Sequence, residues 1–330
     1  MKEIRLGTIG SGVIVESVLE QMQRTKKYHL TAVYSRSGDK AASLAEKFGG
    51  ARVYTDLTAF LADEEMNTVY IASPNSLHYA QMKQALLAGK NVLCEKPFCT
   101  SAAQARELAA LAREQNLMLV EAVPTAFLPN LELIRQNLPQ IGRLRLVQGN
   151  YSQYSSRYDA VRGGKPLPNV FNPEFGGGCL MDLNYYNVYL NVTLFGKPRR
   201  VQYYPNRIGQ QGVDSSGILI LEYGDFVSQA TGAKDTWYDS TFSIQGEDGF
   251  LQIPGGSNGL RQVRLVTKHT DQIFNAQPDP ERLYYEAEAL AGILLTEDQE
   301  TLDRLMETTI KVMEVLEEGR RSANIRFPGE

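Results

Sequence analysis

Residues 4–12 read Ile-Arg-Leu-Gly-Thr-Ile-Gly-Ser-Gly, a short apolar segment that runs directly into a glycine turn. The next residues, 13–22, show the apolar spacing of an amphipathic helix. A strand, a glycine turn and a helix in this order are the context in which a G-x-G motif indicates dinucleotide binding. The first glycine permits the tight turn, and the second lets backbone approach a pyrophosphate at the helix start. The residues expected at the cofactor here are Gly10, Ser11, Gly12, Val13 and Ile14.

This fingerprint departs from its usual form at one position. Val15 stands where a third small residue normally follows Gly12, so the helix is expected to lie slightly farther from the strand. A plain strand-to-helix turn is the alternative interpretation of the segment.

The second predicted strand, His29 to Tyr34, ends in Ser35 and Arg36. Sites for NAD usually carry an acidic residue at about this place, where it binds the ribose hydroxyls. A carboxylate would repel a 2'-phosphate, whereas a serine hydroxyl and a planar guanidinium can bind one. The sequence therefore favours NADP, with NAD as the other cofactor to consider. A solvated arginine before the next helix is the structural alternative.

Strands and helices continue to alternate up to residue 120. Helices are expected at 39–48, 56–62 and 77–88, and strands at 69–72 and 117–120, with the turn Ser73-Pro74-Asn75-Ser76 between strand and helix. Such alternation predicts an α/β fold with a doubly wound parallel sheet. Ligands of such sheets bind outside the carboxyl ends of the strands, so Ser73 is expected to face the cofactor cleft.

A further strand runs through Asn-Val-Leu-Cys-Glu-Lys-Pro-Phe at 91–98 and ends on a charged pair. Pro97 cannot donate to a sheet ladder, so the strand stops where Glu95 and Lys96 stand. Ser101 and Gln104 then form a capping box that opens an amphipathic helix. Lys96 is the candidate catalytic residue of this half. The alternative is an ordinary solvated ion pair in a loop.

The pattern changes after residue 122, which divides the chain into 1–122 and 123–330. Residues 156–178 are rich in proline and glycine and carry several cations. This composition is typical of a lid or binding loop, and a disordered connector is the alternative. Strands with turn signals from 199 to 268 predict an open, mostly antiparallel sheet, and two helices close the chain. An open sheet leaves one face uncovered, which favours a homodimer or homotetramer.

A helix is expected from the glycines at 176–178 to about Phe195. Asp182 and Tyr186 are four residues apart and would share one helix face, where a carboxylate and a phenol could meet a ligand. Tyrosines at helical spacing are also common in cores and interfaces, and that structural interpretation stays open for Tyr185, Tyr186 and Tyr189.

Composition limits the remaining possibilities. A chain of 330 residues with a net charge of -4 favours two domains and argues against nucleic-acid binding. The three cysteines show no paired spacing, which suits a reduced cytoplasmic compartment. No apolar run is long enough for a membrane span, and the scattered His29, His78 and His269 show no metal-ligand spacing.

Taken together, these motifs resemble the glucose-fructose oxidoreductase/inositol dehydrogenase family, usually called Gfo/Idh/MocA. The resemblance covers nearly the whole chain and rests on five segments in order. They are Gly10-Ser11-Gly12, the run Ser73-Pro74-Asn75-Ser76-Leu77-His78, Glu95-Lys96-Pro97, Glu121-Ala122, and Gly-Gly-Gly-Cys-Leu-Met-Asp182 followed by Tyr186. The resemblance implies an N-terminal Rossmann domain and a C-terminal α/β domain whose open sheet forms the subunit interface.

The resemblance also implies roles for the matched residues. Lys96, with a cis bond to Pro97, would lie beside the nicotinamide and the reacting hydroxyl. Asp182 would bind substrate hydroxyls and Tyr186 would transfer the proton, because a nearby cation favours a phenolate. Further cofactor contacts would come from Ser73, Pro74, Asn75, His78 and Glu95.

The residue four positions after Asp182 is Tyr186. In this respect the chain resembles glucose-fructose oxidoreductase and the dimeric dihydrodiol dehydrogenases, which carry tyrosine there and favour NADP. Those enzymes usually place an aromatic residue, Thr or Ser, and Arg after Glu-Ala, where this chain has Pro124, Thr125 and Ala126. The substrate is therefore left open.

The sequence predicts an NADP-preferring dehydrogenase or reductase that acts on a secondary alcohol or carbonyl of a sugar, polyol or cyclic diol. Two alternatives are a non-catalytic transcriptional co-regulator that senses the cofactor, and a hydrolase or lyase that oxidises its substrate transiently.

Overall fold

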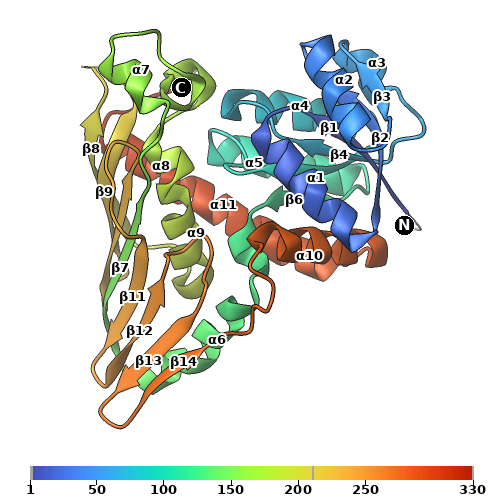
Figure 1. The fold of residues 1–330 in the computed structure, drawn as a ribbon. Helices are drawn as coiled ribbons and strands as arrows, with labels where there is room; N and C mark the ends of the chain where they lie inside the picture. The colour runs from blue at the N-terminus through green and yellow to red at the C-terminus, as the bar shows by residue number, and fades with distance from the viewer. Residues whose placement is uncertain (1–2, 210–211, 329–330) are drawn as a thin grey trace. The chain divides into compact units, whose positions relative to one another are not determined.

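A computed structural model describes residues 3–209 and 212–328, which separate by their contacts into two units (Figure 1). The first unit contains the chain up to Val123 and the segment Glu281–Thr309. The second contains Pro124–Pro280 and the chain from Ile310 onward. The chain therefore passes between the units at three points: after β6, just before α10, and inside the last helix.

The first unit is built on a parallel sheet of six strands in the order β3-β2-β1-β4-β5-β6. Its strands are apolar and buried because helices cover both faces, as in doubly wound sheets. The strands are β1 (Ile4–Ile9), β2 (Tyr28–Tyr34), β3 (Arg52–Tyr54), β4 (Thr68–Ile71), β5 (Asn91–Glu95) and β6 (Leu119–Ala122). The helices are α1 (Val13–Thr25), α2 (Gly38–Lys47), α3 (Leu57–Leu61), α4 (Asn75–Leu87) and α5 (Ala102–Glu114). The predicted doubly wound sheet is confirmed; the short β3 was not predicted.

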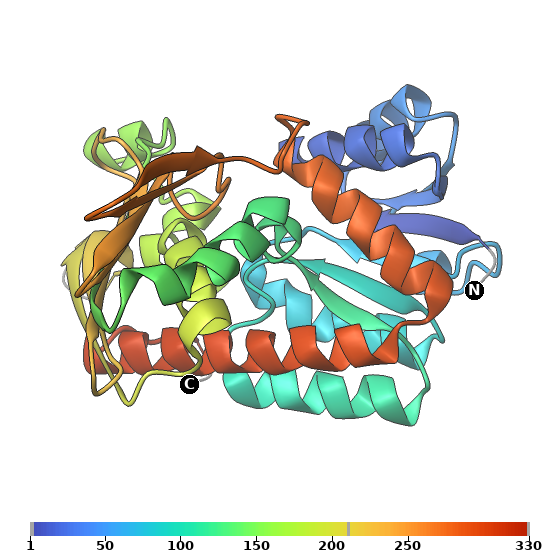
Figure 2. The same cartoon turned by 90° about the horizontal axis from the view of Figure 1, so that it is seen from below.

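Helix α10 (Arg282–Thr296) and the first part of α11 (Gln299–Ser322) belong to the first unit, whereas division at residue 122 assigned them to the second domain. Helix α10 packs beside α1 (Figures 1 and 2). The Tyr28 hydroxyl donates to the Ala287 carbonyl at 2.7 Å. The Thr309 hydroxyl donates to Glu121 at 2.8 Å. These contacts join residues far apart in the sequence, so local patterns could not reveal them.

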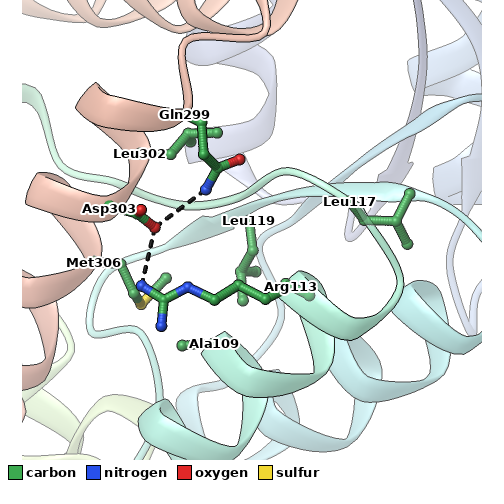
Figure 3. Close-up of a pocket in the computed structure, with 9 residues that line it drawn as sticks. Ala109, Arg113, Leu117, Leu119, Gln299, Leu302, Asp303 and Met306 are labelled. Atoms are coloured by element: carbon green, nitrogen blue, oxygen red, sulfur yellow. Dashed lines mark hydrogen bonds and ion pairs between the residues drawn. The ribbon is translucent and has the colours of Figure 1, made fainter.

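The start of α11 lies beside α5 and leaves a small cavity between them (Figure 3). The Arg113 guanidinium pairs with Asp303 at 3.0 Å, and the Gln299 amide donates to the same carboxylate at 3.1 Å. The cavity measures about 20 Å³, which is room for a single water molecule. A cavity of this size is too small for an organic ligand.

The second unit is an eight-stranded sheet in the order β14-β13-β12-β11-β7-β10-β9-β8. Among the described residues of this sheet, β7 and β10 pair in parallel and the other pairs are antiparallel, which agrees with the predicted mostly antiparallel sheet. The strands are β7 (Leu144–Ser152), β8 (Arg200–Arg207), β9 (Asp214–Glu222), β10 (Val227–Ala233), β11 (Thr241–Gly246), β12 (Gly249–Pro254), β13 (Val263–Thr267) and β14 (Asp271–Phe274).

Helices α8 (Cys179–Asp182) and α9 (Asn184–Phe195) lie against one face of this sheet (Figure 1). The single predicted helix is thus divided at Leu183, although that residue keeps right-handed helical angles. Residues 156–178, expected as a lid or connector, contain α7 (Tyr158–Arg162) and two short 3-10 turns, η3 (Asn169–Phe171) and η4 (Pro173–Phe175). The segment after β6 forms η1 (Pro124–Phe127), α6 (Pro129–Asn137) and η2 (Leu138–Ile141).

Candidate active site

The turn between β1 and α1 depends on two glycines. Gly10 has φ +118°, and a Cβ there would lie 2.7 Å from the Ala72 carbonyl oxygen, so only glycine fits. A Cβ on Gly12 would meet no described atom within 4 Å, which leaves open space in front of the helix start. Val13, the first residue of α1, is 81% exposed. An apolar residue exposed beside an open glycine suits a bound cofactor, so these residues fit the group.

Val15 packs against this turn. Its side chain is fully buried, and its Cγ2 lies 3.5 Å from the Cβ position of Gly10. The valine therefore fills the space that a third glycine would leave empty.

The ends of β1 and β2 bring two hydroxyls together. Ser11 Oγ donates to Ser35 Oγ at 3.1 Å, and Ser35 Oγ accepts the Ser37 N–H at 3.3 Å. Arg36 is exposed beside them, and Ser37 is the N-cap of α2. Hydroxyls, a guanidinium and a helix start form a group that can bind a phosphate.

The turn after β4 is held by His78. Its Nε2 lies 2.9 Å from the Ser73 carbonyl oxygen, and its Nδ1 lies 3.0 Å from the Pro97 carbonyl oxygen. The residue is 1% exposed, and burial lowers the pKa of its imidazole, while the carbonyl contacts oppose that shift. His78 thus connects the β4–α4 turn to the end of β5. The Ser73 hydroxyl donates to Gln81 at 2.6 Å, and Pro74 and Asn75 form the N-cap and first residue of α4.

Lys96 follows β5 directly and is half-buried, with a cis peptide bond to Pro97. The cis bond agrees with the expectation from the family resemblance. Behind it, Glu95 is buried and accepts the Tyr70 hydroxyl at 2.6 Å. Burial raises the pKa of the Glu95 carboxyl, and the Tyr70 hydrogen bond and the Lys96 charge oppose that shift.

Two further buried acids surround this strand end. Glu121 accepts the Phe98 N–H and the Thr309 hydroxyl, both at 2.8 Å. Glu286 on α10 is 1% exposed, and burial raises its pKa well above the ordinary range, with Glu95 adding to the shift. Neither Glu286 nor Tyr70 was singled out from the sequence, because their burial depends on packing between distant segments.

The second unit holds Asp182 and Tyr186. Asp182 ends α8 and forms an ion pair with Lys234, which follows β10. Tyr186 lies in α9 and is 5% exposed; its ring contacts Tyr151 at 5.8 Å and Tyr185 at 6.0 Å between centroids. Lys234 was missed from the sequence. Its signal was a lysine directly after a strand, the same feature that identified Lys96.

Pro124, Thr125 and Ala126, which differ from the residues usual after Glu-Ala in the resembling enzymes, include a residue with a structural role. Thr125 is fully buried, and its hydroxyl donates to the Ser257 carbonyl at 3.0 Å. The segment is thereby fixed to the second unit in the region where the resembling enzymes carry an arginine.

Within residues 3–209 and 212–328, no cluster of three His, Cys, Asp or Glu side chains could bind a metal ion. Among the helices of those same residues, none has the length and apolar character needed to cross a membrane. The three cysteines are buried thiols.

The strand order of the first unit and its glycine turn define a protein of the Rossmann dinucleotide-binding class. Residues 4–122 match the oxidoreductase family with an NAD-binding Rossmann fold, and residues 132–252 match the GFO/IDH/MocA C-terminal domain. The chain belongs to the Gfo/Idh/MocA family of oxidoreductases.

Several proteins are similar to this chain over its whole length. The scyllo-inositol 2-dehydrogenase (NADP(+)) IolU of Bacillus subtilis is 36% identical over 99% of both chains. The trans-1,2-dihydrobenzene-1,2-diol dehydrogenase of Mus musculus is 27% identical over 98% of both. The structure of KijD10, a 3-ketoreductase from Actinomadura kijaniata in complex with NADP and TDP-benzene, has a TM-score of 0.84 at 22% identity, covering 97% of this chain and 98% of that one. This last likeness confirms the fold.

Proposed function

We propose that this oxidoreductase uses NADP in preference to NAD and interconverts a secondary alcohol and a carbonyl of a sugar, polyol or cyclic diol. The reaction is supported chiefly by the position of Lys96 directly after β5. His78 contacts the carbonyl of the next residue, Pro97, and the carbonyl of Ser73. Ligands of parallel sheets bind at such strand ends. The relative named scyllo-inositol 2-dehydrogenase (NADP(+)) makes cyclic polyols the first substrates to test.

The cofactor site is assigned to the first unit. Gly10, Gly12 and the start of α1 would hold the pyrophosphate. Ser35 and Arg36 would bind the 2'-phosphate, because no acidic residue follows β2 directly. His78 would support the site through Ser73 and Pro97 without touching the cofactor, since both its ring nitrogens are engaged.

The chemistry divides among three side chains. A bound nicotinamide supplies the hydride donor or acceptor. Tyr186 takes the hydroxyl proton during oxidation and returns it during reduction. Lys96 stabilises the developing alkoxide with its positive charge, and Asp182 accepts hydrogen bonds from substrate hydroxyls.

A homodimer or homotetramer is part of this proposal. Tyr204 and Ile218 are paired neighbours on β8 and β9, and they are 61% and 39% exposed. The adjacent pair, Tyr203 and Leu219, points to the other face and is buried. An apolar outer face suits a second copy of the chain, and sedimentation equilibrium measures the assembly. A monomer at micromolar concentration would contradict it. We further propose a cytoplasmic location, which suits three buried cysteine thiols.

The function is tested by titrating the purified protein with NADPH and NADH and following nicotinamide fluorescence. NADP reduction is then measured with scyllo-inositol, myo-inositol, glucose and trans-cyclohexane-1,2-diol. We expect tighter NADPH binding and turnover of at least one compound. Tight binding without turnover of any compound would contradict the proposed reaction and support the co-regulator.

Lys96→Met provides the matched test of the site. We expect loss of turnover with NADPH affinity within about tenfold (~1.4 kcal/mol) of the unsubstituted protein. Lys83→Met is the control, because Lys83 forms an exposed ion pair with Glu107 on the same unit. Turnover that survives in Lys96→Met would remove Lys96 from the mechanism.

A further inference from the structure

Lys234 is a buried cation of the second unit, and its ion pair with Asp182 is strongly asymmetric in exposure. The Lys234 side chain is 6% exposed, whereas the Asp182 side chain is 31% exposed. The carboxylate of Asp182 is therefore accessible to a ligand, whereas the ammonium of Lys234 is buried.

The short helix that carries Asp182 is fixed at its start. The Leu180 N–H donates to the carboxylate of Asp214 on β9 at 2.6 Å, and the Tyr203 hydroxyl donates to the same oxygen at 2.6 Å. Asp214 is 2% exposed. Gly178 has φ +123°, and a Cβ there would lie 2.4 Å from the other Asp214 oxygen. The close approach requires glycine, so the start of α8 is held tightly to the sheet.

Lys234 holds the other end of that helix and is itself held in place. Its backbone N–H donates to the Ser215 carbonyl at 2.8 Å. The next residue, Asp235, accepts the Ser215 and Ser216 hydroxyls at 2.7 and 2.9 Å. The Lys234 ammonium lies 5.7 Å from the centroid of the Phe171 ring. A buried ammonium needs a charged partner, and here that partner is the last residue of α8.

We propose that Lys234 is a positioning residue of the substrate site, which orients the Asp182 carboxylate toward the hydroxyls of a polyol or sugar without touching the substrate. The inference rests on the proposed function, because that function gives Asp182 its role. Without Lys234 the carboxylate loses its fixed direction. Substrate binding then weakens, while proton transfer at Tyr186 and cofactor binding in the first unit continue.

The test uses the panel compound with the highest kcat/KM. It compares the single variants Lys234→Met, Lys234→Arg and Asp182→Asn with the double variant that combines Lys234→Met and Asp182→Asn. We expect Lys234→Met to raise KM by about tenfold to a hundredfold, the cost of a lost charge-assisted bond. The value of kcat should stay within about threefold, and Lys234→Arg should recover part of the loss. The double variant should match Asp182→Asn, because Lys234 acts through that residue.

The control is Lys197→Met. Lys197 lies in the turn before β8, and its ammonium pairs with the Glu314 carboxylate at 2.7 Å. A purely structural Lys234 would lower thermal stability without a selective change in KM. If Lys234→Met fails to fold, Lys234→Arg and the charge-free double variant decide, because neither leaves a carboxylate beside an uncharged partner.

A KM within about threefold of the original in Lys234→Met overturns the inference, as does a double variant whose loss is the product of the two single losses. If the original protein turns over no compound, the proposed function fails and this inference fails with it. Turnover by the original protein with no selective effect of Lys234 overturns the inference alone.

Discussion

The Nδ1 atom of His78 lies 3.0 Å from the carbonyl oxygen of Pro97, so a side chain on α4 holds the residue that follows the candidate catalytic lysine. The other ring nitrogen contacts the Ser73 carbonyl, which makes the imidazole a bridge between the ends of β4 and β5. Two neighbouring strand ends are thereby kept in register at the edge where parallel sheets bind ligands.

Replacing His78 with leucine should remove the imidazole that lies between the Pro97 and Ser73 carbonyls, so the carbonyl that accepts its N–H loses its partner. We expect a loss of about 1–3 kcal/mol in the free energy of unfolding, measured in urea. We also expect kcat to fall more than NADPH affinity, because Lys96 loses its support. His269→Gln is the control, since His269 is exposed near the β13–β14 turn. Equal stability of His78→Leu and the original protein would disprove the bridge.

Replacing Arg36 with alanine should weaken NADPH binding by about tenfold to a hundredfold, the range for a hydrogen bond to a charged group. NADH binding should change little, because NADH has no 2'-phosphate. Fluorescence titration of both nucleotides checks this, with Arg113→Ala as the control outside the proposed site. Equal losses for the two nucleotides would refute the phosphate role of Arg36.

Replacing Tyr186 with phenylalanine should lower kcat by about a hundredfold to ten-thousandfold, the usual contribution of acid-base catalysis. Removal of one hydroxyl leaves the ring contacts with Tyr151 and Tyr185 in place. Steady-state kinetics measures the change, and Tyr189→Phe in the same helix is the control. A change limited to KM would make Tyr186 a binding residue only.

Replacing Glu286 with glutamine should alter how stability depends on pH. Burial raises the pKa of Glu286 in the folded protein, whereas the pKa of an unfolded glutamate is about 4.3. Above that pH the folded state keeps a proton that the unfolded state has released, so stability falls as pH rises toward the folded pKa. At lower pH both states are protonated and the penalty is absent.

The variant should therefore lose less stability than the original protein between about pH 5 and 8, as measured by urea unfolding. Glu288→Gln is the matched control, because Glu288 lies on the same helix but is partly exposed and pairs with Lys27. Parallel stability curves for the original protein and Glu286→Gln would show that the buried carboxyl does not titrate in this range.

Local sequence patterns were sufficient for most of the first unit. The segment 4–12 predicted the strand, turn and helix because glycine at position 10 is required by backbone geometry within a few residues. The end of β5 was predicted for the same reason, since Pro97 stops a strand locally. The Ser101 cap of α5 is also local, and its hydroxyl accepts the Gln104 N–H at 3.3 Å.

The tertiary structure decided what depends on contacts between distant segments. Sequence division placed α10 in the second domain, but Tyr28 and Thr309 connect the closing helices to the first unit. The buried acids around Glu95 and the ion pair of Lys234 with Asp182, 52 residues apart, have no local pattern. Burial, pKa shifts and ion pairing arise only when the chain packs, whereas glycine turns, strand ends and caps are set by neighbouring residues.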